Sequence, residues 1–474
     1  MRTPFAPWLQ VQCGGVLLGL AFISPWGWVL AWPALWLILR GIAGRSAWER
    51  AGDGSLAGVW WGLIALGPWL GEAIRVHLGV SSFVSMLFTF AVVLVYGGAH
   101  VAVFATVYGW LPRPRWLSAP AAWVLLEQAR TAALGGVPWA LLGHSQHGWL
   151  RVAQLAELGG VASLSFLIVL TATAFAGEAR ERRAGGAVAV VTLLATLGFG
   201  SLRVATWREA PAAGASVQLV SGGHRSGDRL TTYVTVTREL PAADLTVWPA
   251  GALGDEYLQD ASPAYDALIA TAARVGPLLV GGSRYEGAGH RRHFESAILI
   301  VPPFGLGGIY DKQRLVPFAE QAPVPALPLV ARATSVGAPD QGPLEVGALH
   351  AGVLLGWEPI LPALARAYAR QGVHVLINLA ADEGLGRGVE QQRAFSVFRA
   401  IETRRWLLRA SGTGVSTAVD PAGRVHRLER VRLPATPPPP TVWVRRGSLM
   451  PWLSALVLLL MLVSVAARRW RRPR

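Results

Sequence analysis

The chain has 474 residues, of which 52% are hydrophobic and only 15% are charged. Because a soluble domain usually carries about 25% charged residues, this composition indicates a membrane protein. The formal net charge is +15, but no basic patch interleaved with aromatic residues accompanies it, so nucleic-acid binding is not expected.

Apolar runs long enough to cross a hydrocarbon core of about 30 Å recur along the first part of the chain and once near its end. We expect about eight spans. They lie at residues 8–23, 26–39, 56–70, 83–107, 117–134, 158–176, 187–202 and 449–467.

Arginine residues between these runs, or near their ends, are concentrated in alternate loops. One set of loops contains Arg40, Arg45, Arg50, Arg113, Arg115, Arg180, Arg182 and Arg183, whereas the other short loops contain only Arg75, Arg130 and Arg151. This bias is typical of cytoplasmic loops. It predicts that both termini are cytoplasmic and that a large domain after the seventh span lies outside.

From residue 204 to residue 433, short strand-like bursts alternate with helical stretches, which predicts an α/β domain outside the membrane. Residues 434–448 include four consecutive prolines. Such a run cannot form a helix, so we expect a stiff connector there. The expected organisation is a membrane part at 1–203, the α/β domain, the connector, a last span at 449–467 and a basic cytoplasmic tail at 468–474.

Cysteine and lysine are each used once. Cys13 is the single cysteine, which excludes an intramolecular disulfide, and we expect it to be a buried thiol on a helix. Lys312 is the single lysine among 43 basic residues. A chain that otherwise uses arginine has kept one compact ammonium group, which is the form of cation suited to chemistry. No spacing typical of metal ligands occurs, so neither a metal nor a cofactor is expected.

Short motifs follow one another in a fixed order. In the membrane part they are 123–130, Gly136-Val137-Pro138-Trp139, Leu142-Gly143-His144-Ser145-Gln146, Gln154-Leu155-Ala156 and Ser165-Phe166; in the outer domain they are Val247-Trp248-Pro249, 312–320, 352–358, 378–386 and 398–403. In order and spacing they resemble the apolipoprotein N-acyltransferase family, membrane-embedded relatives of the nitrilases. The resemblance covers nearly the whole chain. It implies a multi-span helical membrane bundle plus an outer nitrilase-like α-β-β-α sandwich, with a pocket that opens toward the bilayer.

The resemblance also implies a reaction. A cysteine thiolate takes an acyl chain from a phospholipid as a thioester, and then passes it to the amine of a diacylated lipoprotein's N-terminal cysteine. A lysine stabilises the oxyanion and a glutamate moves the protons. The implied location is the bacterial inner membrane, and the implied partners are phospholipid and the diacylated lipoprotein N-terminus. An active homologue in the same cell is a further candidate partner.

Carried over residue by residue, the resemblance is incomplete. Lys312 stands at the lysine position, and Glu320 and the pair Trp357-Glu358 match supporting positions. However, Gly356 stands where the nucleophilic cysteine is expected, and Ala250 stands where the glutamate base is expected. Without a thiol, no thioester can form at this position. Further departures occur at Ser221, Ala381, Gly384 and Gly412.

Two roles remain open for Lys312. Its ammonium either pairs with Glu320 or Glu358 in an inherited polar pocket, which would offset the cost of burying the charge, or retains an anion-binding role. The remaining residues expected in a lipid or substrate pocket are Trp139, His144, Gln146 and Trp248. His144 and His147 are expected in a short outer loop, either near lipid headgroups or simply solvated.

Three functions are compatible with this pattern. The first is a catalytically inactive relative that binds lipid or lipoprotein. The second is an active N-acyltransferase with relocated catalytic groups, for which the candidates are Asp255, Glu256, Ser283 and Ser411. The third is a membrane scaffold or interaction protein. The missing nucleophile favours the first over the second, and the retained motifs in the membrane part favour the first over the third.

Overall fold

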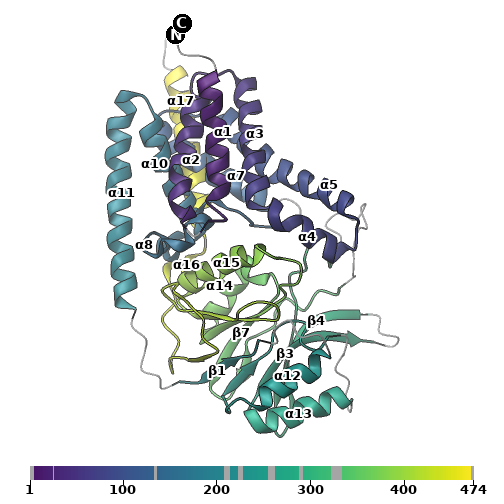
Figure 1. The fold of residues 1–474 in the computed structure, drawn as a ribbon. Coiled ribbons are helices and arrows are strands. Elements are labelled where there is room, and N and C mark those ends of the chain that lie inside the picture. The colour runs from purple at the N-terminus through teal and green to yellow at the C-terminus, as the bar shows by residue number, and fades with distance from the viewer. Residues whose placement is uncertain are drawn as a thin grey trace. The chain divides into compact units, whose positions relative to one another are not determined.

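The computed structural model describes residues 5–24, 26–132, 136–207, 214–221, 228–254, 262–287, 292–321 and 334–470. Contacts divide the chain into two compact units (Figure 1). The helical unit consists of Met1–Arg75, Val80–Thr206 and Arg446–Arg474. The strand-rich unit consists of Val76–Gly79 and Trp207–Arg445.

The described helices that lie wholly or mainly in the helical unit begin with α1 near the N-terminus and end with α17 near the C-terminus. They are α1 (Phe5–Leu20), α2 (Gly27–Ile42), α3 (Ala47–Ala65), α4 (Gly67–Leu78), α5 (Ser82–Val93), the π-helix η1 (Leu94–Ala99), α6 (His100–Tyr108), α7 (Arg115–Ala132), the 3-10 helix η3 (Leu142–Gly148), α8 (Leu150–Ala153), α9 (Ala156–Gly159), α10 (Val161–Ala176), α11 (Ala179–Thr206) and α17 (Met450–Trp470).

Among the described residues, three helices are long and apolar enough to cross a membrane: Ser82–Tyr108, Ala179–Thr206 and Met450–Arg468. A fourth span results if Leu150–Gly159 and Val161–Ala176, which meet at 118°, count as one broken span. This number is smaller than the eight apolar runs of the sequence. The helices α1 and α2 have 16 residues each, which at 1.5 Å per residue gives about 24 Å, short of a hydrocarbon core.

Small residues let the helices of this unit approach closely. A Cβ atom at Gly15 of α1 would lie 2.4 Å from the carbonyl oxygen of Ala57 on α3, and one at Gly58 would lie 2.1 Å from the oxygen of Gly97. Contacts of this kind are typical of membrane helix pairs, in which van der Waals packing replaces the hydrophobic effect. Cys13, on the same helix α1, is exposed and not buried as expected.

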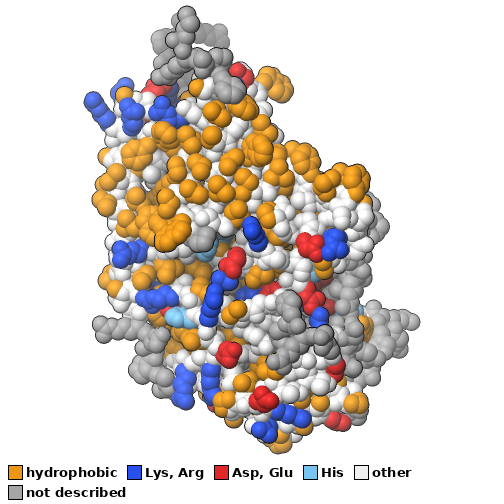
Figure 2. Space-filling view, in the orientation of Figure 1, with side chains coloured by type: hydrophobic (Ala, Val, Ile, Leu, Met, Phe, Trp, Pro, Cys, Tyr) orange, Lys and Arg blue, Asp and Glu red, His pale blue; other side chains and the backbone are white. Residues whose placement is uncertain are grey.

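Large apolar side chains are exposed on several helices of this unit. They include Phe83, Leu87 and Phe90 on α5, Val191, Leu194 and Leu202 on α11, and Leu456, Leu459 and Leu460 on α17. Figure 2 shows hydrophobic side chains gathered over the helical unit on the face that it presents. An apolar surface of this extent marks contact with a membrane or another protein, so the helical unit fits the membrane part of the chain.

The strand-rich unit contains two sheets of six strands each in the described residues. The first has the order β12-β1-β2-β3-β4-β5 and the second the order β11-β10-β9-β8-β7-β6. The strands are β1 (Ser216–Leu219), β2 (Leu245–Val247), β3 (Leu278–Glu286), β4 (Arg292–Val301), β5 (Gly305–Asp311), β6 (Leu344–Val346), β7 (Leu349–Leu355), β8 (Val375–Ala380), β9 (Trp406–Ser411), β10 (Thr417–Val419), β11 (Val425–His426) and β12 (Arg430–Arg432).

Helices cover the outer faces of both sheets. On the first side lie α12 (Arg229–Arg238) and α13 (Pro263–Val275), and on the other side lie α14 (Pro362–Arg370) and α15 (Gly388–Thr403) (Figure 1). The sheets face each other through β4 with β7 and β5 with β6. The short helices η4 (Glu358–Ile360) and α16 (Val442–Arg446) complete the unit. This α-β-β-α arrangement confirms the fold class expected from the sequence.

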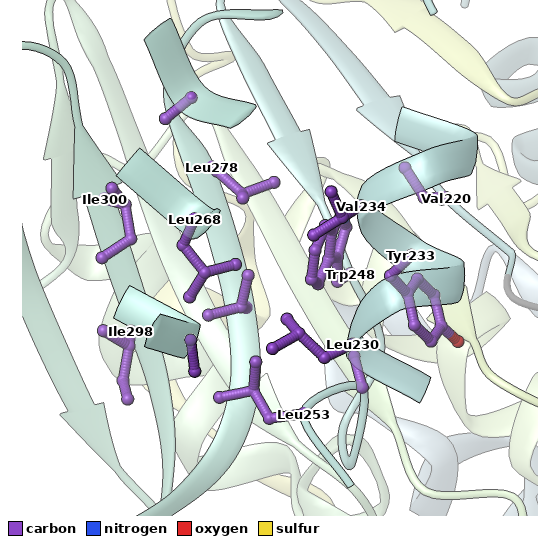
Figure 3. Close-up of a cluster of buried hydrophobic side chains, with 14 residues drawn as sticks. Val220, Leu230, Tyr233, Val234, Trp248, Leu253, Leu268, Leu278, Ile298 and Ile300 are labelled. Atoms are coloured by element: carbon purple, nitrogen blue, oxygen red, sulfur yellow. The ribbon is translucent and has the colours of Figure 1, made fainter. Parts of the chain in front are cut away.

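Local signals explain why α13 forms where it does. The hydroxyl of Ser262 accepts a hydrogen bond from the amide of Tyr265, Pro263 occupies the first turn, and Gly276 ends the helix at a φ of +95°. The buried face of α13 packs with α12 against the first sheet. Figure 3 shows the resulting core, in which Leu268 and Leu278 lie close to Trp248 and the side chains of α12.

Candidate functional site

The expected functional positions lie at the ends of strands. The strands β1, β2 and β3 pair in parallel, as do β7, β8 and β9, so their carboxyl ends meet at one edge of each sheet. Gly356 follows β7, Ala381 follows β8 and Lys312 follows β5. A Cβ atom built on Gly356 would lie 3.4 Å from Lys312 Nζ and 3.7 Å from Ala381 Cβ. The structure therefore brings these three positions together.

Ala250 belongs to the neighbouring strand end. A Cβ atom on Gly281 of β3 would lie 2.6 Å from the Cα atom of Ala250, and one on Gly412 would lie 3.6 Å from Pro249 Cγ. The turn after β2 thus packs tightly against β3 on one side and faces the end of β9 on the other. Asp255 and Glu256, considered as substitutes for a carboxylate at this turn, lie outside the described residues.

Gly356 is held in a conformation that few other residues adopt. Its φ is +53°, in the left-handed region that costs an L-residue roughly 1–2 kcal/mol. Its amide donates to the carbonyl of Leu379 at 2.8 Å, and its own carbonyl accepts from Asn378 Nδ2 at 3.1 Å. The contacts of the built Cβ are of ordinary van der Waals length, so the position has room for a side chain.

Lys312 is only 4% exposed. Its Nζ donates to Glu320 Oε1 at 2.6 Å, while Glu320 Oε2 accepts from the amide of Val316 at 2.7 Å. Of the two carboxylates considered as partners from the sequence, Glu320 is the one that pairs with Lys312. This ion pair offsets the cost of burying the ammonium group.

Glu358 is fully buried and binds four donors. Its Oε1 accepts from the amides of Gln313 and Arg314 at 2.9 and 3.0 Å, and its Oε2 accepts from the amide of Leu355 at 2.7 Å and from the Tyr310 hydroxyl at 2.9 Å. Burial raises the pKa of this carboxyl above its ordinary value, although the hydrogen bonds oppose the shift. Four donors fill the acceptor positions of a carboxylate, so Glu358 holds the backbone in place and has no position left for a substrate proton.

Trp357 also connects the turn after β7 to the turn after β5. Its indole Nε1 donates to the carbonyl of Arg314 at 2.6 Å, and its side chain is almost entirely buried. Glu358 binds the amide of the same residue, Arg314. The turn after β7 and the turn after β5 are therefore joined by both residues that follow Gly356.

A second buried network was not anticipated from the sequence. Both terminal nitrogens of Arg409 on β9 donate to the carboxylate of Asp382, which follows β8, and Nη2 also donates to Gln392 Oε1 at 2.9 Å. An arginine inside the apolar strand Trp406–Ser411 was the available signal, because a charge in such a strand needs a buried partner. Its partner, Asp382, could not be identified from the sequence because it follows a different strand, β8.

Ser411, one of the candidate relocated nucleophiles, belongs to this network. Its hydroxyl donates to Asp382 Oδ2 at 2.5 Å and accepts from the amide of Gly414 at 2.9 Å, and its side chain is fully buried. The carboxylate that it contacts is already bound by the two nitrogens of Arg409. Ser411 therefore forms part of the buried hydrogen-bond network that holds Asp382 and Arg409.

Trp248, expected in the pocket, lies elsewhere. It is 0% exposed, its Nε1 donates to Thr237 Oγ1 at 2.9 Å, and its ring lies 5.2 Å from that of Tyr233. Both neighbours belong to α12. The indole is thus part of the hydrophobic core between the first sheet and its helices (Figure 3), because successive side chains of an extended segment point to opposite faces.

The other expected pocket residues lie in the helical unit and are buried. Trp139 stacks on Trp69 with a centroid distance of 4.7 Å. Gln146 donates to the Trp28 carbonyl at 3.0 Å and accepts from Trp32 Nε1 at 3.3 Å. His144 is also buried, which excludes the solvated one of its two expected alternatives. A lipid-contacting role for these side chains stays a prediction.

No group of three or more His, Cys, Asp or Glu side chains that could hold a metal ion occurs in the described parts of the chain. Among the described residues at the strand ends, the polar groups nearest Gly356 include the Lys312–Glu320 pair and the backbone groups that bind Gly356.

Two family models match the chain, one in the helical unit and one that covers most of the strand-rich unit. Residues 14–174 match the family model of the apolipoprotein N-acyltransferase N-terminal domain, and residues 193–428 match that of carbon-nitrogen hydrolase. The structure of Saccharomyces cerevisiae Nit3, a member of branch 10 of the nitrilase superfamily, is 17% identical over 46% of this chain and 87% of that chain, with a TM-score of 0.38.

Curated relatives match most of the chain. An apolipoprotein N-acyltransferase of Geobacter metallireducens is 30% identical over 90% of this chain and 87% of its own length. One of Caulobacter vibrioides is 31% identical over 80% of this chain and 77% of its own length. These matches confirm the resemblance inferred from the motifs, and the chain belongs to the apolipoprotein N-acyltransferase family.

Proposed function

We propose that the protein is a catalytically inactive member of its family that binds an acyl lipid, or the lipidated N-terminus of a lipoprotein, at the strand ends around Gly356. The observation that carries this proposal is the position of Gly356. It lies beside Lys312 Nζ, with the supporting contacts of Lys312 and Glu358 in place, and has no side chain to act as a nucleophile.

The missing group removes the whole covalent route. Groups of a catalytic set act as a unit, so loss of the nucleophile leaves only the acceleration that binding and oxyanion stabilisation supply. Ala250 adds a second loss, because a methyl group cannot move a proton. The supports described above do not replace either group, since the acceptor positions of Glu358 are filled and Ser411 is buried in the Asp382–Arg409 network.

The charges around Lys312 indicate which ligand group would bind. An ammonium has three donors, and the described residues supply one polar partner, Glu320 Oε1. The opposite charges of Lys312 and Glu320 cancel, so a second anion would be repelled by Glu320. A neutral acceptor such as the ester carbonyl of an acyl lipid avoids this repulsion and can use a remaining donor.

We also propose the bacterial inner membrane as the location, with both termini cytoplasmic and the strand-rich unit on the outer side. The three apolar helices and the membrane-embedded family support a membrane protein, and the arginine bias of the short loops supports this orientation. A membrane-impermeant thiol reagent on intact spheroplasts tests it. A cysteine introduced at exposed Val425 should react, and one at exposed Trp48 should react only after lysis.

Binding without chemistry can be tested with two phospholipids that differ in one bond type. Native mass spectrometry of the detergent-solubilised protein would compare diester phosphatidylethanolamine with its diether analogue, which has the same headgroup and chains but no ester carbonyl. We expect retention of the diester lipid at intact mass and weaker retention of the diether lipid. Failure to retain either lipid would contradict the proposed binding of an acyl lipid.

The variant Lys312→Met tests the role assigned to the ammonium. It should lower the retention of the diester lipid to that of the diether lipid, because the variant lacks the ammonium group that is proposed to bind the ester carbonyl. Arg229→Met changes a cation of an exposed pair with Glu383 and serves as the control. If Lys312→Met and Arg229→Met retain the diester lipid equally, Lys312 does not bind the carbonyl.

A further inference from the structure

A group of buried polar side chains lies inside the helical unit, separate from the strand ends. It comes from α3, from the junction of η1 and α6, and from α7. The members are Trp61, Tyr96, His100, Trp123, Glu127 and Arg130. Ionisable residues inside a membrane bundle are costly and call for a functional explanation.

Part of this cluster holds an irregular segment in place. Arg130 Nη1 donates to the carbonyl of Tyr96 at 3.0 Å, and Nη2 donates to that of Ala140 at 3.0 Å. Ala140 has a φ of +49°, which is strained for a residue with a side chain. Glu127 Oε1 accepts from the amide of Leu142 at 2.7 Å. Arg130, expected in an outer loop, thus lies on α7 and fixes the backbone before η3.

The carbonyl of Tyr96 can accept a hydrogen bond from another helix because it lies in the π-helix η1. A π-helical turn widens the helix and disturbs the regular ladder of backbone hydrogen bonds. Here the carbonyl of Tyr96 accepts from Arg130 of a different helix. The guanidinium also lies over the rings of Trp61 and Tyr96, at 5.1 and 5.6 Å from their centroids.

Several polar atoms of the same cluster remain without a hydrogen-bond partner among the described residues. They are Trp61 Nε1, Tyr96 Oη, His100 Nε2 and Arg130 Nε, together with Trp123 Nε1 and Glu127 Oε2, whose side chains interact with each other outside hydrogen-bond geometry. These groups are contiguous, since the ring of His100 lies 4.8 Å from that of Trp123 and 6.1 Å from that of Trp61. An unpaired buried polar group costs roughly 1–3 kcal/mol, so several such groups in one place point to a ligand.

We propose that this cluster is an internal water-binding site of the helical unit. The charges of Glu127 and Arg130 cancel, so the site favours a neutral ligand. The free groups include indole N–H donors and a carboxylate acceptor, and the hydroxyl of Tyr96 can act as either. Water supplies both kinds of partner in a small volume and usually makes about three hydrogen bonds in such sites.

Hydration at this site supports the role of Glu127 and Arg130 in the irregular segment. Water bound to Glu127 Oε2 and Arg130 Nε satisfies the part of each charged group that the backbone contacts leave free. The pair can then hold Ala140 and Leu142 inside an apolar bundle without unsatisfied charge.

X-ray radiolytic footprinting of the full chain in detergent tests this proposal, because hydroxyl radicals formed from bound water label adjacent buried side chains. We expect labelling of Trp61 and Trp123, which are almost fully buried. Trp248 is the matched control, because it is equally buried but its Nε1 is bound to Thr237 in a hydrophobic core. Labelling of Trp61 and Trp123 no higher than that of Trp248 would overturn the proposal.

The variant His100→Leu gives a second comparison, because it replaces one polar wall of the site with an apolar side chain. Labelling of Trp61 should then fall toward the level of Trp248. Unchanged labelling of Trp61 in the folded variant would contradict the assignment of the water to this cluster. If the variant does not fold, the comparison of Trp61 with Trp248 in the unmodified chain still decides.

Discussion

The strand ends of the strand-rich unit carry two sets of residues that differ in their side-chain chemistry. The support residues, Lys312, Glu320, Glu358, Asp382 and Arg409, form buried ion pairs and hydrogen bonds. The reaction positions, defined as four of the positions where we expect the sequence to depart from the family (Ala250, Gly356, Ala381 and Gly412), have a methyl group or no side chain. From the sequence we expect Lys312, Glu320 and Glu358 of the first set to match the family pattern and the second set to depart from it.

The difference follows from what each set does for folding. Removing a support residue leaves buried partners without hydrogen bonds, which is costly. Removing a reactive group leaves its neighbours satisfied, and at Gly356 it also relieves a strained backbone, since φ is +53° there. A family member can therefore keep the framework of its site after losing the chemistry.

The largest expected effect comes from Glu358→Ala, a change to a support residue. It deprives three buried amides and the hydroxyl of Tyr310 of their acceptor, so we expect a loss of more than about 3 kcal/mol in stability. The midpoint of thermal unfolding in detergent measures it. Glu383→Ala, which breaks the exposed pair with Arg229, should change stability by less than about 1 kcal/mol. Equal losses of stability in the two variants would contradict the structural role assigned to Glu358.

The Lys312–Glu320 pair should show strong coupling. Glu320→Gln leaves a buried ammonium without its counter-ion, and we expect a loss of about 2–3 kcal/mol. In Lys312→Met/Glu320→Gln, the loss should be smaller than the sum of the two single losses, with a coupling energy of about 1–3 kcal/mol. Thermal unfolding of the four proteins of the cycle measures it. Additive losses would mean that the pair does not act as a unit.

A side chain at a reaction position should be tolerated with a modest cost. At Gly356→Ala the Cβ atom makes ordinary contacts, so only the left-handed φ opposes it, and we expect a loss of about 1–2 kcal/mol. Gly352→Ala is the contrasting variant, because its Cβ atom would lie 2.6 Å from the ring of Tyr368. A larger loss for Gly356→Ala than for Gly352→Ala would show that the position has no room for a nucleophile.

The smallest expected effect is a dependence on pH. Burial raises the pKa of Glu358 above its ordinary value of 4.5, so its contribution to stability is complete below that pH and is lost as the pH rises through the folded-state pKa. The unfolding midpoint of the unmodified protein minus that of Glu358→Gln should therefore fall as the pH rises above 4.5. Other titrating groups cancel in this difference, and a constant difference would contradict the raised pKa.

Much of the fold could be predicted from the sequence, because strand-like bursts and helical stretches alternate between residues 204 and 433. The proximity of Lys312 to Gly356 followed from the family motifs. The Asp382–Arg409 pair did not, since its members are 27 residues apart. Their contact depends on the parallel pairing of β8 with β9, which places Asn378 opposite Arg409. Register of this kind is set by tertiary packing and is not visible in a local pattern.

Two other expectations differ from the structure for physical reasons. Hydropathy identifies apolar runs, but it does not separate a helix that spans a membrane from a shorter one packed inside a bundle, such as α2, half of whose residues are buried. Arg130 was assigned to an outer loop when the arginines were divided between the two sets of loops. The backbone carbonyls of Tyr96 and Ala140, which accept its hydrogen bonds, could not be identified before the π-helix and the irregular segment were seen.

The proposed loss of chemistry at Gly356 is tested most directly by the intact mass of the purified protein. The protein would be incubated with phosphatidylethanolamine and then with a diacylated lipopeptide, beside an active relative that has the cysteine. We expect no mass gain of one acyl chain and no triacylated lipopeptide from the unmodified protein, and an acyl-thioester only after Ala250→Glu is combined with Gly356→Cys. A covalent acyl adduct on any residue of the unmodified protein, or conversion of the lipopeptide, would contradict an inactive site.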